Sequence, residues 1–152
     1  MRQFGAAAVF WIAASIPVLA QPVFDAALDM KAKRARAEFA CAILAAEGPA
    51  VLHGLASPLA QQAHEGYLPV AEAVLPAIKG ENNGPLSAYI ATVDAQYVVA
   101  MAFGEAVQSI NRLLDEKHPF GTPGSSYETT KMMRELVAGS EFGSRNCELL
   151  LP

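Results

Sequence analysis

The sequence predicts an all-α fold: a single domain of four or five helices around one long central helix, with one disulfide. Alanine, the strongest helix former, is abundant along the chain. Glycine and proline fall mostly between segments of helical periodicity rather than inside them. No repeat, low-complexity tract or long linker divides residues 21–152, so we expect them to share one core, as a chain of about 130 residues can.

The first twenty residues have the three-part pattern of a secretory signal peptide. Arg2 supplies a positive start, residues 4–16 form an apolar run, and small residues at 18 and 20 precede Gln21. We therefore expect residues 1–20 to be cleaved, which predicts a periplasmic or secreted protein. The alternative is an uncleaved membrane anchor, because the apolar stretch just reaches the roughly 17–25 residues that span a bilayer. Pro17, near the end of the run, favours cleavage.

The two cysteines, Cys41 and Cys147, both lie after the predicted cleavage site. In an exported protein, two thiols most simply form one disulfide. The bridge would close a loop of about 105 residues and stabilise the fold by roughly 4–5 kcal/mol in the chain-entropy model. The alternative is a pair of free buried thiols.

The chain is mildly acidic, with a formal net charge of −4, and cleavage would remove the positive Arg2. Such a charge gives no electrostatic reason to bind nucleic acid. No segment after residue 20 is apolar for long enough to span a membrane, so we expect no transmembrane segment once the signal is removed.

The first helix is expected from about Pro22 to Glu47, because apolar residues recur at helical spacing and Gly48-Pro49 then ends the pattern. Residues 49–79 predict two or three short helical pieces. Ser57-Pro58 favours one start, Gly66 an end and Pro69 another start. Pro76 predicts a kink or an early stop, because proline removes a backbone donor.

After a loop at residues 80–84, apolar residues step by three and four from Pro85 to about Lys117. This pattern predicts a helix of roughly 30 residues and about 45 Å, long enough to be the central helix. Gly104 in its middle predicts a close helix crossing, because glycine there otherwise costs about 1 kcal/mol relative to alanine.

A turn at residues 118–124 precedes a capping-box pattern, with Ser125 as the N-cap and Glu128 at the third helical position. The last helix is expected to end at about Val137. From about residue 138 we expect an irregular tail that carries Cys147 back to the first helix.

Known catalytic and metal-binding patterns are missing from the sequence. The three histidines, His53, His64 and His118, do not share the spacing of metal ligands, and capping or surface roles explain them. There is no Gly-x-Ser-x-Gly elbow and no Cys-x-x-Cys-His haem site. We therefore assign no catalytic residue, no metal and no cofactor, and we expect that the protein is not an enzyme.

Two groups of residues are candidate binding sites. Lys31, Lys33, Arg34 and Arg36 form a basic cluster that could contact an acidic partner such as anionic lipid head groups. The alternative is a solvated helix face, with Asp29 pairing with Lys33 one turn away.

The second group, on the helix predicted over 85–117, is Tyr89, Tyr97 and Met101. These side chains could line a pocket for a small apolar ligand. The alternative is that they are core residues, with the tyrosine hydroxyls at the rim.

These observations favour an exported, non-catalytic binding or protein-interaction protein whose partner and oligomeric state stay open. One alternative is a carrier of a small apolar ligand, and another is an enzyme of unrecognised type. A cavity beside Tyr97 would favour the carrier. A solid core with an exposed apolar patch would favour the interaction protein, and a cleft with converging ionisable groups would favour the enzyme.

Overall fold

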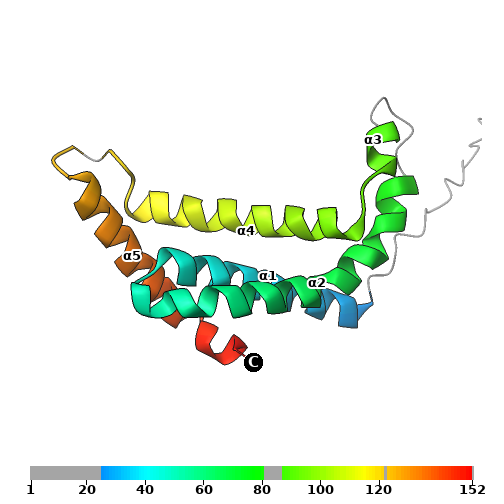
Figure 1. Ribbon diagram of the computed structural model, residues 1–152, viewed down its shortest axis with the longest axis horizontal. Helices are drawn as coiled ribbons and strands as arrows, with labels where there is room; N and C mark the ends of the chain where they lie inside the picture. Colours follow the sequence, from blue (N-terminus) through cyan, green and yellow to red (C-terminus); the bar gives the residue numbers. More distant parts are fainter. Residues whose placement is uncertain (1–24, 81–86, 122, 152) are drawn as a thin grey trace, which may run out of the picture.

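The computed structural model describes residues 25–80, 87–121 and 123–151, and in this part of the chain it contains helices and no strand (Figure 1). The elements, in chain order, are α1 (Ala26–Glu47), the 3₁₀ helix η1 (Ala50–Leu52), α2 (His53–Gly80), α3 (Ser87–Ala91), α4 (Ala95–Lys117), α5 (Tyr127–Ser144) and the 3₁₀ helix η2 (Cys147–Leu150). The predicted all-α bundle is confirmed. The predicted signal peptide, residues 1–20, and the loop at 81–84 lie outside the described residues.

The helices α1 and α2 form a long hairpin, α4 runs along one side of it, and α5 crosses the end where the hairpin turns (Figure 1). The helix α1 packs against α2, α4, α5 and η2, and α4 packs against α1, α2 and α5.

The hairpin turn and α5 approach each other closely at two glycines. A Cβ atom on Gly48 would lie 2.8 Å from the carbonyl oxygen of Leu44, and one on Gly139 would lie 2.9 Å from Cδ of Pro49. Both positions therefore require glycine. The end of α1 at Glu47 agrees with the prediction, whereas its start at Ala26 is later than predicted, because the Asp25 side chain accepts a hydrogen bond from the Ala27 amide.

The short pieces predicted over 49–79 are wrong, because after η1 the chain forms one helix, α2, with Pro58, Pro69 and Pro76 inside it. Gly66 does not end a helix. It faces α1, where an added Cβ would lie 3.7 Å from Cβ of Ala35. Packing of the buried side of α2 against α1 outweighs the hydrogen bonds lost at the prolines. The C-terminal part of α2 turns away from the hairpin towards α3 (Figure 1), as a proline-induced bend would produce.

The single helix predicted over 85–117 is also wrong, because the chain breaks at residues 92–94 and forms α3 and α4. Asp94 caps α4, and its Oδ1 accepts a 2.8 Å hydrogen bond from the Tyr97 amide. With 23 residues, α4 is about 35 Å long. The close crossing predicted at Gly104 is absent, since an added Cβ there would meet nothing within 4 Å.

The last helix begins one residue later than predicted, with Ser126 as the N-cap; its Oγ accepts a 3.1 Å hydrogen bond from the Thr129 amide. The irregular tail predicted from residue 138 is wrong, because α5 continues to Ser144. Ala138 and Phe142 explain this extension, since both are buried against the hairpin. Asn146, in the left-handed region with φ 53°, then turns the chain into η2.

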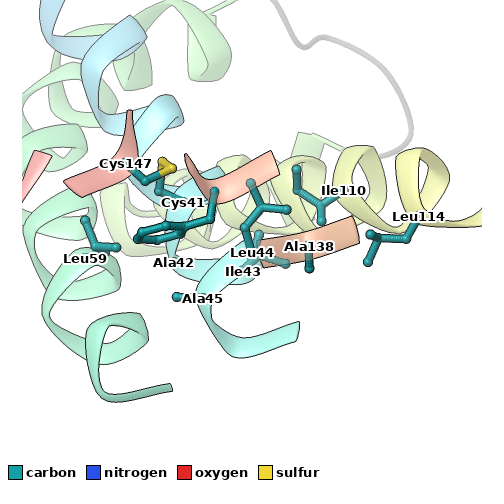
Figure 2. Close-up of a cluster of buried hydrophobic side chains, with 11 residues drawn as sticks. Cys41, Ala42, Ile43, Leu44, Ala45, Leu59, Ile110, Leu114, Ala138 and Cys147 are labelled. Carbon is teal, nitrogen blue, oxygen red and sulfur yellow. A yellow bond between two sulfur atoms is a disulfide. The ribbon is translucent and has the colours of Figure 1, made fainter. Parts of the chain in front are cut away.

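The core consists of two clusters. The disulfide cluster, shown in Figure 2, contains Cys41, Ala42, Ile43, Leu44, Ala45, Leu59, Ile110, Leu114, Ala138, Phe142 and Cys147. The Tyr67 cluster contains Ala35, Phe39, Ala63, Tyr67, Val70, Ala71, Val99 and Ala102. The predicted bridge between Cys41 and Cys147 is confirmed, and their Cα atoms are 5.6 Å apart.

In the described part of the chain, no helix is both long enough and apolar enough to cross a membrane.

Candidate functional site

Two of the three predicted pocket residues lie at one pocket. Tyr97 and Met101 line a pocket of about 410 Å³, here called the Tyr97 pocket, whereas the side chain of Tyr89 lies outside what the structure describes. Its walls come from α1, α2, α3, the turn before α4, and α4. The lining residues are Arg36, Tyr67, Ile78, Ile90, Val93, Tyr97, Val98, Met101, Ala102 and Glu105.

The capped start of α4 positions the pocket rim. Because Asp94 fixes the first turn, Tyr97 and Met101 follow on one face of α4, one turn apart. Their side chains are 42% and 54% exposed, so both lie at the rim and neither is a core residue. Below them, Tyr67, Val93 and Ala102 are buried and form the floor.

Four of the lining residues carry polar side-chain groups: Arg36, Tyr67, Tyr97 and Glu105. Nη2 of Arg36 donates a 3.4 Å hydrogen bond to the Tyr67 hydroxyl, and its Cζ lies 5.9 Å from the centroid of the Tyr67 ring. The ring of Phe39 packs against Tyr67 at a centroid distance of 6.4 Å and holds it in place. Glu105 also lines the pocket, and it is exposed.

Arg36 lies beside the pocket without a carboxylate partner. Within the described residues, no carboxylate oxygen is within 4.0 Å of its guanidinium, and the same holds for Glu105 towards any basic group. An arginine has five N–H donors, and only one of them is used by Tyr67. The pocket therefore combines apolar walls with unused hydrogen-bond donors at one edge.

The basic cluster is divided among separate environments. Lys33 pairs with Asp29 at 2.6 Å, and Nε of Arg34 lies 2.8 Å from Oε1 of Glu38. Lys31 and Arg36 lie at different pockets. The structure therefore does not bring the four basic residues into one flat patch.

The residues around Glu38 form a buried polar contact that the sequence analysis did not predict. Glu38 is 2% exposed, and its Oε1 accepts hydrogen bonds from Arg34 and from Nε2 of Gln62. In the sequence, Glu38 lies between Ala35 and Phe39, which α1 also buries. This position could have indicated a buried carboxylate. These contacts join α1 to α2 and supply a structural role for Arg34.

Each histidine has a local structural role. The imidazole Nε2 of His53 lies 2.9 Å from the carbonyl oxygen of Gly48, and Nε2 of His64 lies 2.6 Å from Oε1 of Gln96. His118 is the C-cap of α4. No group of three or more His, Cys, Asp or Glu side chains in the described ranges is arranged to hold a metal ion.

A second apolar groove, of about 370 Å³, follows the opposite flank of α4 and was not predicted. Phe103, Val107 and Asn111 line it from α4, and α1 and α2 supply the other wall. Phe103 also packs edge-on against Phe39 at 5.5 Å. The spacing of Phe103 and Val107, one turn apart, was the available signal.

No protein-family model, curated protein or solved structure matches the chain. The function is therefore argued from the geometry of the site.

Proposed function

We propose that this chain is an exported, non-catalytic binding protein that holds a small apolar ligand in the Tyr97 pocket. The observation that carries the proposal is a pocket of about 410 Å³ with mostly apolar walls and a few polar groups at one edge. Small-molecule sites typically have volumes of about 300–1,000 Å³ and this kind of lining.

The arrangement of side chains supports ligand binding over a flat interaction surface. The floor of the pocket is buried, and its apolar walls come from three helices and the turn before α4. Met101 at the rim can change rotamer at low cost, which lets a pocket adapt to ligands of different shape. A concave site with a fixed floor and an adaptable rim suits a small molecule.

Binding of the neutral apolar dye Nile red tests this proposal. We expect its fluorescence to rise and shift to the blue on titration with the wild-type protein. A Met101→Lys variant should bind the dye about tenfold more weakly, because loss of one apolar contact of this size costs roughly 1.5–3 kcal/mol.

Met132→Lys is the matched control. Met132 has the same exposure as Met101, 54%, but lies on α5 outside the pocket lining. Dye affinity should therefore match that of the wild type. Absence of dye binding, or equal loss in both variants, would contradict the proposal.

The proposed export rests on the pattern of residues 1–20 and is supported by the disulfide. A bridge between Cys41 and Cys147 persists in oxidising compartments such as the periplasm or the extracellular space. Intact mass of protein from the periplasm or medium should correspond to a chain that begins at Gln21. Such material should lack tryptophan fluorescence, because the single tryptophan is Trp11. Recovery of the uncleaved chain from the cytosol would contradict export.

A further inference from the structure

We propose that the ligand of the Tyr97 pocket is a single-chain amphiphile with one carboxylate, whose head group pairs with Arg36. This inference rests on the proposed function and specifies the chemical class of the ligand.

Arg36 is held in position but not neutralised. The Tyr67 hydroxyl accepts one of its hydrogen bonds, and its guanidinium lies near the Tyr67 ring. Tyr67 is itself only 7% exposed, so this support is fixed to the core. The remaining donors have the planar, forked geometry that matches a carboxylate with two parallel hydrogen bonds.

Three of the four other arginines in the described chain have a carboxylate partner, whereas Arg112, which is exposed, has none there. Arg34, Arg134 and Arg145 each lie within 4.0 Å of a carboxylate: Glu38, Asp115 and Glu141, respectively. Arg36 instead lines an apolar pocket and has no such partner among the described residues. A ligand carboxylate would give Arg36 the charged partner that no described carboxylate supplies.

An apolar wall extends from Arg36 along the pocket. Ile78, Ile90 and Val98 are half-buried, and Met101 covers them at the rim. This surface offers hydrocarbon contact on one side and donors at one edge, which is the pattern of an amphiphile with a terminal head group. Arg36 is exposed, so water can accept from its remaining donors, and a ligand carboxylate at this edge would replace that water with a charge-assisted contact.

Glu105 also lines the pocket. Its negative charge disfavours a second anionic group, so one carboxylate fits better than two. Glu105 could attract a cationic head group, but no hydrogen bond or ion pair within the described residues fixes its side chain. Arg36 is fixed by Tyr67, and the geometry therefore favours the anion.

Isothermal titration calorimetry of the full chain with decanoate, decanol and decyltrimethylammonium tests the inference, because the three probes share one chain and differ in head-group charge. We expect decanoate to bind about tenfold more tightly than decanol, as one charge-assisted contact allows. Arg36→Gln should remove this preference, so that decanoate and decanol bind this variant with equal affinity.

Lys33→Gln is the matched control, because it removes the same charge from the same helix at an exposed site outside the pocket. The preference for decanoate should survive in this variant. Equal affinity for decanoate and decanol, tighter binding of the cation, or the same loss in both variants would overturn the carboxylate assignment. If none of the three probes binds, the proposed function itself fails.

Tyr67→Phe tests the positioning role of the hydroxyl. The ring and its packing stay, so the circular dichroism spectrum should not change. The ratio of decanoate to decanol affinity should fall by about threefold, because one neutral hydrogen bond no longer orients Arg36. An unchanged ratio would show that the hydroxyl does not position the guanidinium.

Discussion

The two core clusters of the bundle differ in what fills them. The disulfide cluster joins α1, α2, α4, α5 and η2, and it holds every large apolar side chain that is less than 2% exposed among the described residues. The Tyr67 cluster joins only α1, α2 and α4, and half of its members are alanines. The partly open Tyr97 pocket borders the second cluster, where Tyr67 and Ala102 belong to both.

This difference suggests a division of roles between the two ends. Large interlocking side chains and a covalent bridge stabilise one end, because burial of apolar area and loop closure are the two main sources of stability there. Small side chains at the other end bury less area but leave room beside α4. We therefore expect mutations at the disulfide end to change stability, and mutations at the Tyr67 end to change binding.

The largest effect is expected from removal of the bridge. A Cys41→Ala/Cys147→Ala variant should lose about 4 kcal/mol of unfolding free energy, because the bridge closes a loop with a sequence separation of 106. Urea denaturation followed by circular dichroism measures this change. A loss below about 1 kcal/mol would show that the bridge does not dominate this end.

A cavity at the same end should have the next largest effect. Leu114, fully buried in the disulfide cluster, contacts the hairpin from α4. Leu114→Ala should cost about 3 kcal/mol by lost transfer energy and the cavity left behind. Dye binding in the Tyr97 pocket should persist under native conditions. Loss of binding without unfolding would show that the two ends are coupled.

Enlarging one alanine in each cluster sharpens the comparison further. Ala138→Leu should cost about 2 kcal/mol, because Ala138 is fully buried between α5 and the hairpin. Ala102→Leu should cost less than about 1 kcal/mol, because its side chain can extend into the pocket. Only the second variant should block the dye. Equal destabilisation by both would show that the Tyr67 end is packed as tightly as the other.

The smallest effect is a dependence on pH at the disulfide end. Lys117 donates a 2.6 Å hydrogen bond to Glu141, and this contact, with a weaker one from Arg145, lowers the pKa of the Glu141 carboxyl below its ordinary value of 4.5. A lowered pKa in the folded state gives stability that is complete above the ordinary value and is lost as the pH falls through the lowered one.

Because Lys117 is half exposed, this contribution should be roughly 0.5 kcal/mol. Urea denaturation of the wild type and of Glu141→Gln should show a gap that narrows as the solution is acidified below pH 4.5. A gap that stays constant with pH would mean that the carboxylate charge is not what stabilises the contact between α4 and α5.

Local signals predicted part of this fold. Gly48-Pro49 ends α1 as expected, because both residues disfavour a continued helix and no packing opposes the turn. Two cysteines in a chain with an export pattern were enough to predict the bridge. The end of α1 depends on residues that are close in sequence. The bridge depends on a pairing that two cysteines can make in only one way.

The errors arose where distant packing decided the structure. Gly66 and three prolines stay inside α2, because its other face packs against α1, a contact that no local pattern encodes. The break before α4 was missed because Val93 continues the apolar spacing, and this hid the capping role of Asp94.

The candidate site divides in the same way. Tyr97 and Met101 share one helix face and could be found from spacing alone. Arg36 and Tyr67 come from α1 and α2, and only the register of the hairpin brings them beside α4. Arg36 was expected in a basic cluster because it lies near other basic residues in the sequence. Its position next to Ala35 does not show which residues of α2 and α4 lie beside it in the fold.

The positions of the two cysteines in the chain also limit when the disulfide can form. Cys41 lies in the first helix and Cys147 in η2, so Cys41 stays a free thiol while the ribosome adds 106 further residues. In the native structure, α5 crosses the hairpin and η2 brings Cys147 to Cys41. Oxidation to the native bridge therefore follows synthesis of residues 42–147, and molecules that still gain mass on alkylation are those in which the bridge has not formed.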